Sequence, residues 1–101
     1  MNLLYIFALY VWKVAGKMFC LGDIARFDSI NLKCDPEWSA TLRDEYPQII
    51  PGWHMNKTMW NTVYLNGLHE KFIESLILHS YREVVRKLPK KIQINIKLTH
   101  E

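Results

Sequence analysis

The first half of the chain alternates between apolar runs and short polar breaks, which is typical of strands joined by hairpins. An unbroken apolar run covers residues 3–12, and a second run follows at 18–21 after a turn that contains Gly16. The aromatic and β-branched residues of the first run favour a buried strand over a helix. Residues 29–34 alternate polar and apolar side chains, so they predict a further, half-buried strand.

A helix is predicted to begin at Asp35 and Pro36. The Asp35 side chain can accept hydrogen bonds from the free N–H groups of a first turn, and Pro36 suits the first helical position. Three apolar residues then recur every four positions on one helical face: Trp38, Leu42 and Tyr46. Pro47 ends the helix, because the residue before a proline is disfavoured in the α conformation.

Residues 49–65 predict an extended segment, a turn and another strand. Pro51 places the extended segment at 49–55 on an edge of the sheet or at a bulge. Residues 56–59 predict a turn or a short helical turn. Residues 60–65 alternate again and end at the turn made by Asn66 and Gly67.

The longest periodic segment extends from about residue 69 to residue 88 and predicts a helix, with apolar positions at i, i+3, i+4 and i+7. Acidic residues lie near its start and basic residues near its end, which complements the helix dipole. Pro89 ends this helix. The tail at 92–98 alternates strictly, and its pattern predicts a strand.

Two helices and about five strands, mostly connected by hairpins, predict an α+β fold. We expect a two-layer sandwich in which helices cover one face of an antiparallel sheet. The chain has 101 residues and shows no internal repeat or linker, so we expect a single domain over 1–101.

Charge and cysteine content narrow the classes of function. Residues 1–50 carry five Lys/Arg and six Asp/Glu, whereas residues 51–101 carry eight and four. The basic second half permits nucleic-acid binding. Two cysteines without a Cys-x-x-Cys spacing predict reduced thiols in a cytoplasmic protein, with no metal and no cofactor. The first apolar run is too short to span a bilayer, so we expect no membrane association.

Two surfaces are candidates for nucleic-acid contact. The first is a turn between two strands that combines aromatic, amide and cationic side chains: Trp53, His54, Asn56, Lys57, Trp60 and Asn61. On such a wing a lysine can meet phosphate, an asparagine can bond to base edges, and an exposed tryptophan can stack on unpaired bases. The alternative is that both tryptophans belong to the core and that His54 and Asn61 satisfy backbone groups of the turn.

The second candidate surface is the basic end of the long helix with the segment that follows it. A further lysine lies in the first hairpin turn, and the whole set is Arg82, Arg86, Lys87, Lys90, Lys91 and Lys17. These cations can hold phosphates in a salt-sensitive way. The alternative is a solvated helix end with no ligand.

No arrangement of residues predicts an enzyme. The serines lie in no nucleophile-elbow pattern, and the four histidines lack the spacing of a zinc site. His79 lies beside the apolar stripe of the long helix, so we expect it to be a hydrogen-bonded structural residue. Cys34 precedes a helix start that could lower its pKa, but a buried strand thiol is the favoured interpretation.

Several motifs occur together in one order along residues 10–91. They are Val-Trp-Lys-Val-Ala-Gly-Lys-Met-Phe at 11–19, Leu-Lys-Cys-Asp-Pro at 32–36, Leu-Arg at 42–43, Tyr-Pro at 46–47, Pro-Gly-Trp-His-Met-Asn-Lys at 51–57, Trp-Asn-Thr-Val at 60–63, His-Ser-Tyr at 79–81 and Lys-Leu-Pro-Lys at 87–90. With these motifs the chain resembles the MmcQ/YjbR family of small bacterial proteins. The resemblance implies a frataxin-like (CyaY-like) sandwich and a DNA-binding role through a "double-wing" motif.

The chain departs from the family at both ends. Members of the family place a helix before the first strand, whereas about nine mostly apolar residues precede the matching region here. If that helix is missing, part of the sheet face is uncovered, which predicts an exposed apolar patch and a possible homodimer. The alternating tail at 92–101 has no counterpart in the family pattern.

Two hypotheses for function follow from the sequence. The first is a small non-enzymatic protein that binds DNA through the wing and the basic helix end. The second is a module that binds another protein or a small ligand on the open sheet face and has no nucleic-acid role.

Overall fold

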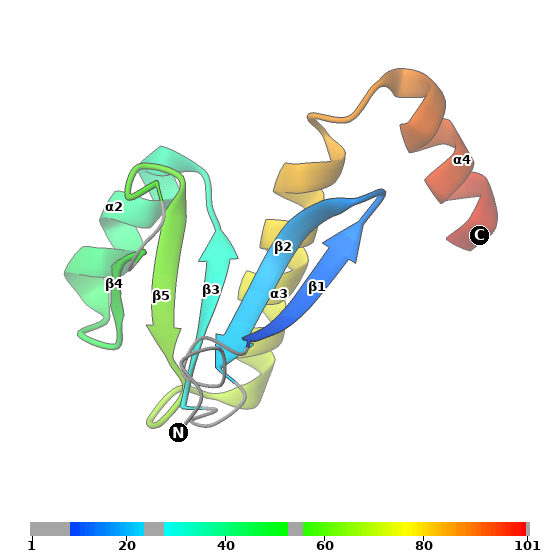
Figure 1. The fold of residues 1–101 in the computed structure, drawn as a ribbon. Helices are drawn as coiled ribbons and strands as arrows, with labels where there is room; N and C mark the ends of the chain where they lie inside the picture. Colours follow the sequence, from blue (N-terminus) through cyan, green and yellow to red (C-terminus); the bar gives the residue numbers. More distant parts are fainter. Residues whose placement is uncertain (1–8, 24–27, 53–55, 101) are drawn as a thin grey trace.

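The computed structural model describes residues 9–23, 28–52 and 56–100. Along the chain the elements are β1 (Leu9–Val14), β2 (Lys17–Asp23), β3 (Ser29–Lys33), α2 (Pro36–Glu45), β4 (Ile49–Pro51), β5 (Trp60–Tyr64), α3 (Glu70–Val85) and α4 (Lys90–His100). The strands form one antiparallel sheet in the order β1-β2-β3-β5-β4. Helices α2 and α3 lie behind the sheet in Figure 1. The predicted α+β sandwich is therefore confirmed.

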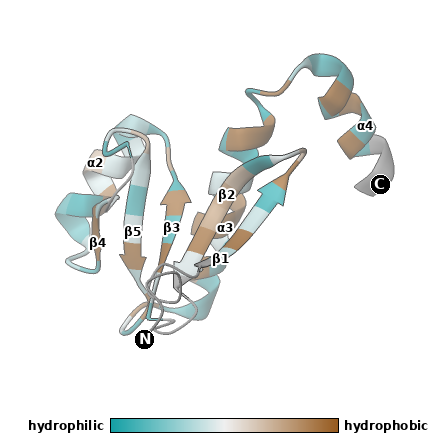
Figure 2. Ribbon diagram, in the orientation of Figure 1, coloured by the Kyte–Doolittle hydropathy of each residue, from teal (hydrophilic) through white to brown (hydrophobic). Residues whose placement is uncertain are grey.

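The core lies between the sheet and these two helices. Its centre combines Ile30 and Val63 from the middle strands with Leu42 of α2 and Leu76 of α3, all at most 4% exposed. The central strands accordingly carry brown, hydrophobic residues in Figure 2. The two helices also contact each other, because Phe72 and the residue at the end of α2, Tyr46, stack with ring centroids 4.7 Å apart. The helices thus share one apolar layer, as the spacing of their apolar residues predicted.

The β1–β2 hairpin contains a tight turn and a bulge. Ala15 and Gly16 have φ of 48° and 77°, a left-handed conformation in which glycine is unstrained. The strand register shifts next to Phe19, which has no partner in β1. Successive residues of a regular strand point to opposite faces, but a bulge redirects side chains. Phe19 and the next residue, Cys20, therefore both face the core, and the Phe19 ring forms a T-shaped pair with Tyr81 of α3.

Helix α2 begins as the sequence predicts. The Asp35 carboxylate accepts a hydrogen bond from the Trp38 N–H at 3.0 Å, and Pro36 occupies the first helical position. Strand β4, which ends at Pro51, is an edge strand, as its proline predicted. These signals therefore placed the helix start and the sheet edge correctly.

Strand β1 is exposed, so the prediction of a buried strand is wrong for its described side chains. Tyr10 is 49% exposed and Trp12 is 40% exposed. Trp12 is opposite Cys20, so both aromatic residues lie on the helix-facing side of the sheet. Helix α3 makes few contacts with this edge strand. Exposed apolar side chains therefore lie on this edge strand, and whether the sheet face is uncovered as the sequence predicted depends on residues outside the described ones.

The tail forms α4, so the strand predicted for 92–98 is wrong. Figure 1 shows α4 beyond the end of α3, away from the sheet edges. A strand needs a neighbouring strand for its backbone, whereas a helix satisfies its backbone locally. The first turn of α4 bonds to Pro89, and the Gln93 Nε2 donates to the Leu88 carbonyl at 2.6 Å. These bonds fix the start of α4 to the end of α3.

Candidate nucleic-acid interface

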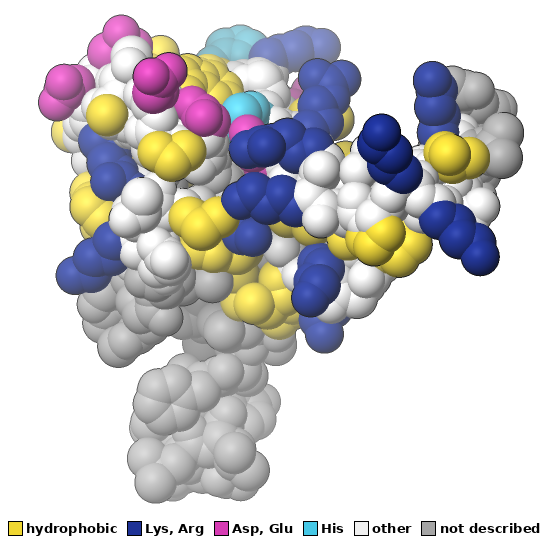
Figure 3. Space-filling view, turned by 90° about the horizontal axis from the view of Figure 1, so that it is seen from above, with side chains coloured by type: hydrophobic (Ala, Val, Ile, Leu, Met, Phe, Trp, Pro, Cys, Tyr) yellow, Lys and Arg dark blue, Asp and Glu magenta, His cyan; other side chains and the backbone are white. Residues whose placement is uncertain are grey.

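One end of the sheet gathers positive charge from three separate elements. Lys17 begins β2, Lys33 ends β3, and Arg86 and Lys87 directly follow α3. The antiparallel order brings the start of β2 beside the end of β3, and α3 packs against both strands. Figure 3 views this end of the molecule and shows dark-blue side chains gathered on it. We call Lys17, Lys33, Arg86 and Lys87 the basic rim.

Lys33 lies at the centre of the basic rim. Burial lowers the pKa of its ammonium group, and the charges of Lys87 and Lys17 lower that pKa further, while Glu83 opposes them. The Lys33 Nζ also lies 5.7 Å from the ring centroid of Trp60, within cation–π range. Perturbed pKa values of this kind are more frequent at functional sites than elsewhere on a protein.

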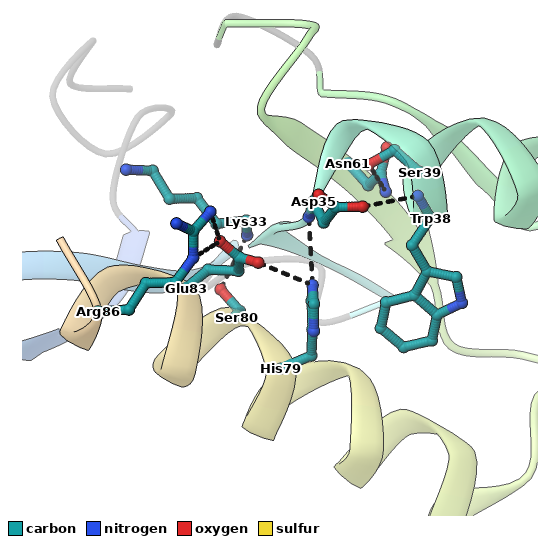
Figure 4. Close-up of polar contacts among 9 residues, drawn as sticks. All are labelled: Lys33, Asp35, Trp38, Ser39, Asn61, His79, Ser80, Glu83 and Arg86. Carbon is teal, nitrogen blue, oxygen red and sulfur yellow. Dashed lines mark hydrogen bonds and ion pairs between the residues drawn. The ribbon is translucent and has the colours of Figure 1, made fainter.

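Glu83 supplies the negative charge beside the basic rim. Its side chain is only 12% exposed, and its Oε2 accepts a hydrogen bond from the Arg86 Nε at 2.7 Å. The Arg86 Nη2 lies 2.7 Å from the same oxygen. The Glu83 Oε1 is 3.6 Å from the His79 Nε2 (Figure 4). Glu83 therefore neutralises part of the positive charge that the fold brings to this end.

His79 has the structural role that its position predicted. Its Nε2 accepts a hydrogen bond from the Asp35 backbone N–H at 3.1 Å, and its ring forms a T-shaped pair with the Trp38 ring at a centroid distance of 4.5 Å. Figure 4 shows it between α3 and the start of α2. The backbone of Lys33 is attached to the same helix through the Ser80 hydroxyl. These contacts fix the basic rim to the core.

The turn before β5 is held by an arginine that the sequence analysis named in a family motif but not as a site residue. The Arg43 Nη2 donates to the Lys57 carbonyl at 2.6 Å, and its Nε donates to the Asn61 Oδ1 at 2.7 Å. The Asn61 Nδ2 in turn donates to the Ser39 hydroxyl at 3.2 Å. Within the turn, the Asn56 Oδ1 accepts the Thr58 N–H at 3.0 Å. These hydrogen bonds thus attach the turn and the start of β5 to α2.

The candidate residues of the wing differ in exposure: some are exposed and others are buried. Asn56 and Lys57 are exposed on the turn, whereas Trp60 is 6% exposed and Asn61 is 2% exposed. Base stacking by Trp60 and base contact by Asn61 are therefore wrong predictions, because both side chains are already enclosed by protein. The core alternative is correct for Trp60, whereas the Asn61 side chain bonds to the side chains of Arg43 and Ser39 and not to turn backbone groups. Trp53 and His54 lie outside the described residues.

The candidate residues of the helix end are all exposed, but they do not form one cluster. They are Lys17, Arg82, Arg86, Lys87, Lys90 and Lys91. Lys17 and Lys87 lie near enough to Lys33 to lower its pKa. Lys90 and Lys91 belong to α4, beyond Pro89. Sequence analysis missed Lys33 and Glu83, although Lys33 occupies a polar position of an alternating strand directly before a predicted helix start.

The two cysteines are buried free thiols, as expected for Cys34. Burial raises the pKa of Cys20 to about 11. Burial also raises the pKa of Cys34, and a hydrogen bond with Ser39 opposes this rise. The thiolate that metal binding or nucleophilic chemistry needs is therefore disfavoured at both positions.

Within residues 9–23, 28–52 and 56–100, no three His, Cys, Asp or Glu side chains converge as a metal ion requires. No helix of the described segments has the length and apolar character needed to cross a bilayer. A cavity of about 10 Å³ is lined by Cys34, Asn61 and His79 together with apolar core residues. It has room for about one water molecule and none for a metabolite.

Solved structures share this fold. The crystal structure of the Deinococcus radiodurans protein DR2400, which carries the family-model domain DUF419, matches 88% of this chain and 67% of its own with a TM-score of 0.76 and 32% identity. A crystal structure of a Pseudomonas syringae protein matches 71% of this chain and 73% of its own, with a TM-score of 0.61 and 38% identity. The sandwich is therefore common to this chain and to these bacterial proteins.

Curated relatives and a family model agree with the structural matches. The uncharacterized protein YbdF of Escherichia coli O157:H7 is 39% identical over 86% of this chain and 73% of its own length. The uncharacterized protein YjbR of Escherichia coli K12 is 34% identical over 76% of this chain and 67% of its own length. The YjbR family model matches residues 6–83. The resemblance inferred from the motifs is thereby confirmed, and the chain belongs to the YjbR family.

Proposed function

We propose that the protein binds nucleic acid through the basic rim and catalyses no reaction of its own. The observation that carries this proposal is the placement of Lys17, Lys33 and Lys87. Three separate elements hold these lysines near one another, although their charges repel. A bound polyanion relieves that repulsion and releases the counter-ions of its own phosphates.

The spread of positive charge favours a nucleic-acid backbone over a single small anion. Figure 3 shows a second group of dark-blue side chains on α4, which carries exposed Lys90, Lys91 and Lys97. A surface of this kind can meet several successive phosphates. Contacts to phosphates position a protein on the duplex and carry no sequence information directly.

The turn before β5 supplies the remaining candidate contact. Asn56 and Lys57 are exposed there, and Arg43 restrains the turn from the side of α2. Because Trp60 is enclosed, base stacking from this position has no part in the proposal. We therefore expect binding that depends strongly on salt and weakly on sequence.

The test measures binding of a fluorescent duplex by the intact chain at several salt concentrations. We expect affinity to fall steeply between about 50 and 200 mM salt. Lys87→Gln is expected to weaken binding and to reduce the salt slope by about 1. Lys71→Gln, which removes the same charge from the opposite end of α3, is the matched control and should leave the slope unchanged. Absence of binding at about 50 mM salt would contradict the proposal.

A second candidate function, self-association, is favoured by the exposed aromatic residues of β1. This strand lies at the sheet edge, and its Leu-Tyr-Val-Trp-Lys-Val sequence contains one charge. Pairing with β1 of a second copy would cover Tyr10 and Trp12 around a two-fold axis. Sedimentation at increasing concentration should reveal a dimer that Trp12→Glu abolishes. Ile50→Glu, on the opposite edge strand, should leave the dimer intact, and a monomer at every concentration would exclude this function.

A further inference from the structure

Building on the proposed nucleic-acid role, we propose that the Glu83 carboxylate is an internal competitor that occupies Arg86 until a backbone phosphate displaces it. The site is thus a single phosphate position within the basic rim. Its ligand is one phosphate of a nucleic-acid backbone, and Glu83 is a positioning residue for Arg86.

The contact between Glu83 and Arg86 is of the type that a phosphate forms. The Arg86 Nε and Nη2 both lie 2.7 Å from one oxygen of the Glu83 carboxylate. The planar fork of a guanidinium group binds carboxylate and phosphate oxygens in the same manner. A phosphate oxygen can therefore replace the carboxylate oxygen without any change in the donors.

The two partners differ in exposure, which makes the exchange possible. The Arg86 side chain is 60% exposed, whereas the Glu83 side chain is 12% exposed. The guanidinium group can therefore meet a ligand from solvent while the carboxylate stays against the protein. Ion pairs with a largely exposed partner are weak, so a multiply charged ligand can compete for Arg86.

The positive charge of Lys33 still acts on the Glu83 carboxylate when Arg86 leaves it. The negative charge of Glu83 acts on the Lys33 ammonium group, because it raises the Lys33 pKa against the lowering by burial and by the other lysines. Figure 4 shows Lys33 on the side of Glu83 where Arg86 lies. The Glu83 Oε1 is 3.6 Å from the His79 Nε2, but that nitrogen accepts the Asp35 N–H. That nitrogen offers Glu83 no hydrogen while it accepts this bond, whereas the positive charge of Lys33 still acts on the carboxylate.

The test compares Glu83→Gln with Glu74→Gln in the salt-dependent duplex assay. Both variants remove one negative charge from α3, but Glu74 lies near the other end of the helix and is exposed. We expect Glu83→Gln to bind roughly threefold to tenfold more tightly at a similar salt slope, because Arg86 meets the same phosphate in both proteins but no carboxylate competes for it in the variant. Equal behaviour of the two variants would overturn the proposal.

A spectroscopic measurement on the unmodified protein decides the matter even if a variant fails to fold. The NMR resonance of the Arg86 Nε should shift on addition of duplex, as its acceptor changes from carboxylate to phosphate. Binding without any shift of this resonance would refute the role of Glu83 and leave the proposed function standing. Absence of duplex binding by the wild-type chain would remove both.

Discussion

The Ser80 hydroxyl accepts a hydrogen bond from the Lys33 backbone N–H at 2.8 Å and donates one to the Phe19 carbonyl at 2.5 Å. Ser80 is fully buried in α3, so one side chain joins this helix to both β2 and β3. The backbone position of Lys33 therefore depends on a core contact. The geometry of the basic rim is set from inside the protein.

Ser80→Ala should destabilise the fold. The substitution leaves a part-buried N–H and a part-buried carbonyl without this partner, which costs about 1 to 3 kcal/mol in the free energy of unfolding. Urea denaturation would measure the loss. Ser75→Ala is the control, because the Ser75 hydroxyl is exposed and bonds within its own helix, to the Phe72 carbonyl. Equal losses in the two variants would contradict a special role for Ser80.

Arg43→Lys should loosen the turn before β5, although it preserves the charge. An ammonium group cannot reproduce the fork that reaches both the Lys57 carbonyl and the Asn61 side chain. We expect a loss of about 1 to 3 kcal/mol in stability and faster hydrogen exchange at the Trp60 amide, which donates to the Asn56 carbonyl. Arg82→Lys on the exposed face of α3 serves as control. Unchanged exchange at Trp60 in Arg43→Lys would disprove that Arg43 restrains the turn.

Gly52→Ala should be strongly destabilising for a steric reason. A Cβ at this position would lie 2.8 Å from the Trp60 Cβ and 2.9 Å from the Trp60 carbonyl oxygen. The Gly52 N–H also donates to that oxygen at 2.8 Å, so the two backbones cannot separate without losing the bond. Thermal unfolding should show a loss of about 1 to 3 kcal/mol. A wild-type melting temperature would show that β4 has room to move.

Stability should fall when the pH rises from about 9 to 11, because of Cys20. Its pKa is raised from 9.0 to about 11 in the fold, so the native thiol keeps its proton where the unfolded thiol has lost it. This stabilising effect is complete below pH 9 and disappears as the pH passes 11, a change of up to about 3 kcal/mol. The lowered pKa of Lys33 acts in the opposite direction.

Cys20→Ala provides the comparison for this pH dependence. Denaturation midpoints measured across the alkaline range should fall less in the variant than in the wild-type chain. The wild-type Cys20 should also react slowly with a thiol reagent at neutral pH until the protein unfolds, since it is 5% exposed. Parallel pH curves for the two proteins would contradict the assignment.

The fold was largely predictable because local signals and the global arrangement agree. The cap at Asp35, the edge proline at Pro51 and the apolar stripe of α3 each placed an element correctly. The candidate site was less predictable, because its groups meet only through tertiary structure. Nothing in the spacing of Lys17, Lys33 and Lys87 indicates that they are neighbours. Likewise, the alternating pattern of a strand shows which residues share a face of the sheet, but it does not show which face the helices cover. The burial of Trp60 could therefore not be predicted from the pattern.

Helix α4 contains a sequence that suits two secondary structures. Ile92, Ile94 and Ile96 share one face of a strand, but in a helix Ile94 lies opposite the other two, and it is 58% exposed. An unfolded tail would therefore present a ready segment for cross-chain β pairing. The lysines at 90, 91 and 97 bracket this segment, as charged gatekeeper residues do in aggregation-prone sequences. Formation of helix α4 thus removes this segment from β pairing between chains, and it also extends the charged surface.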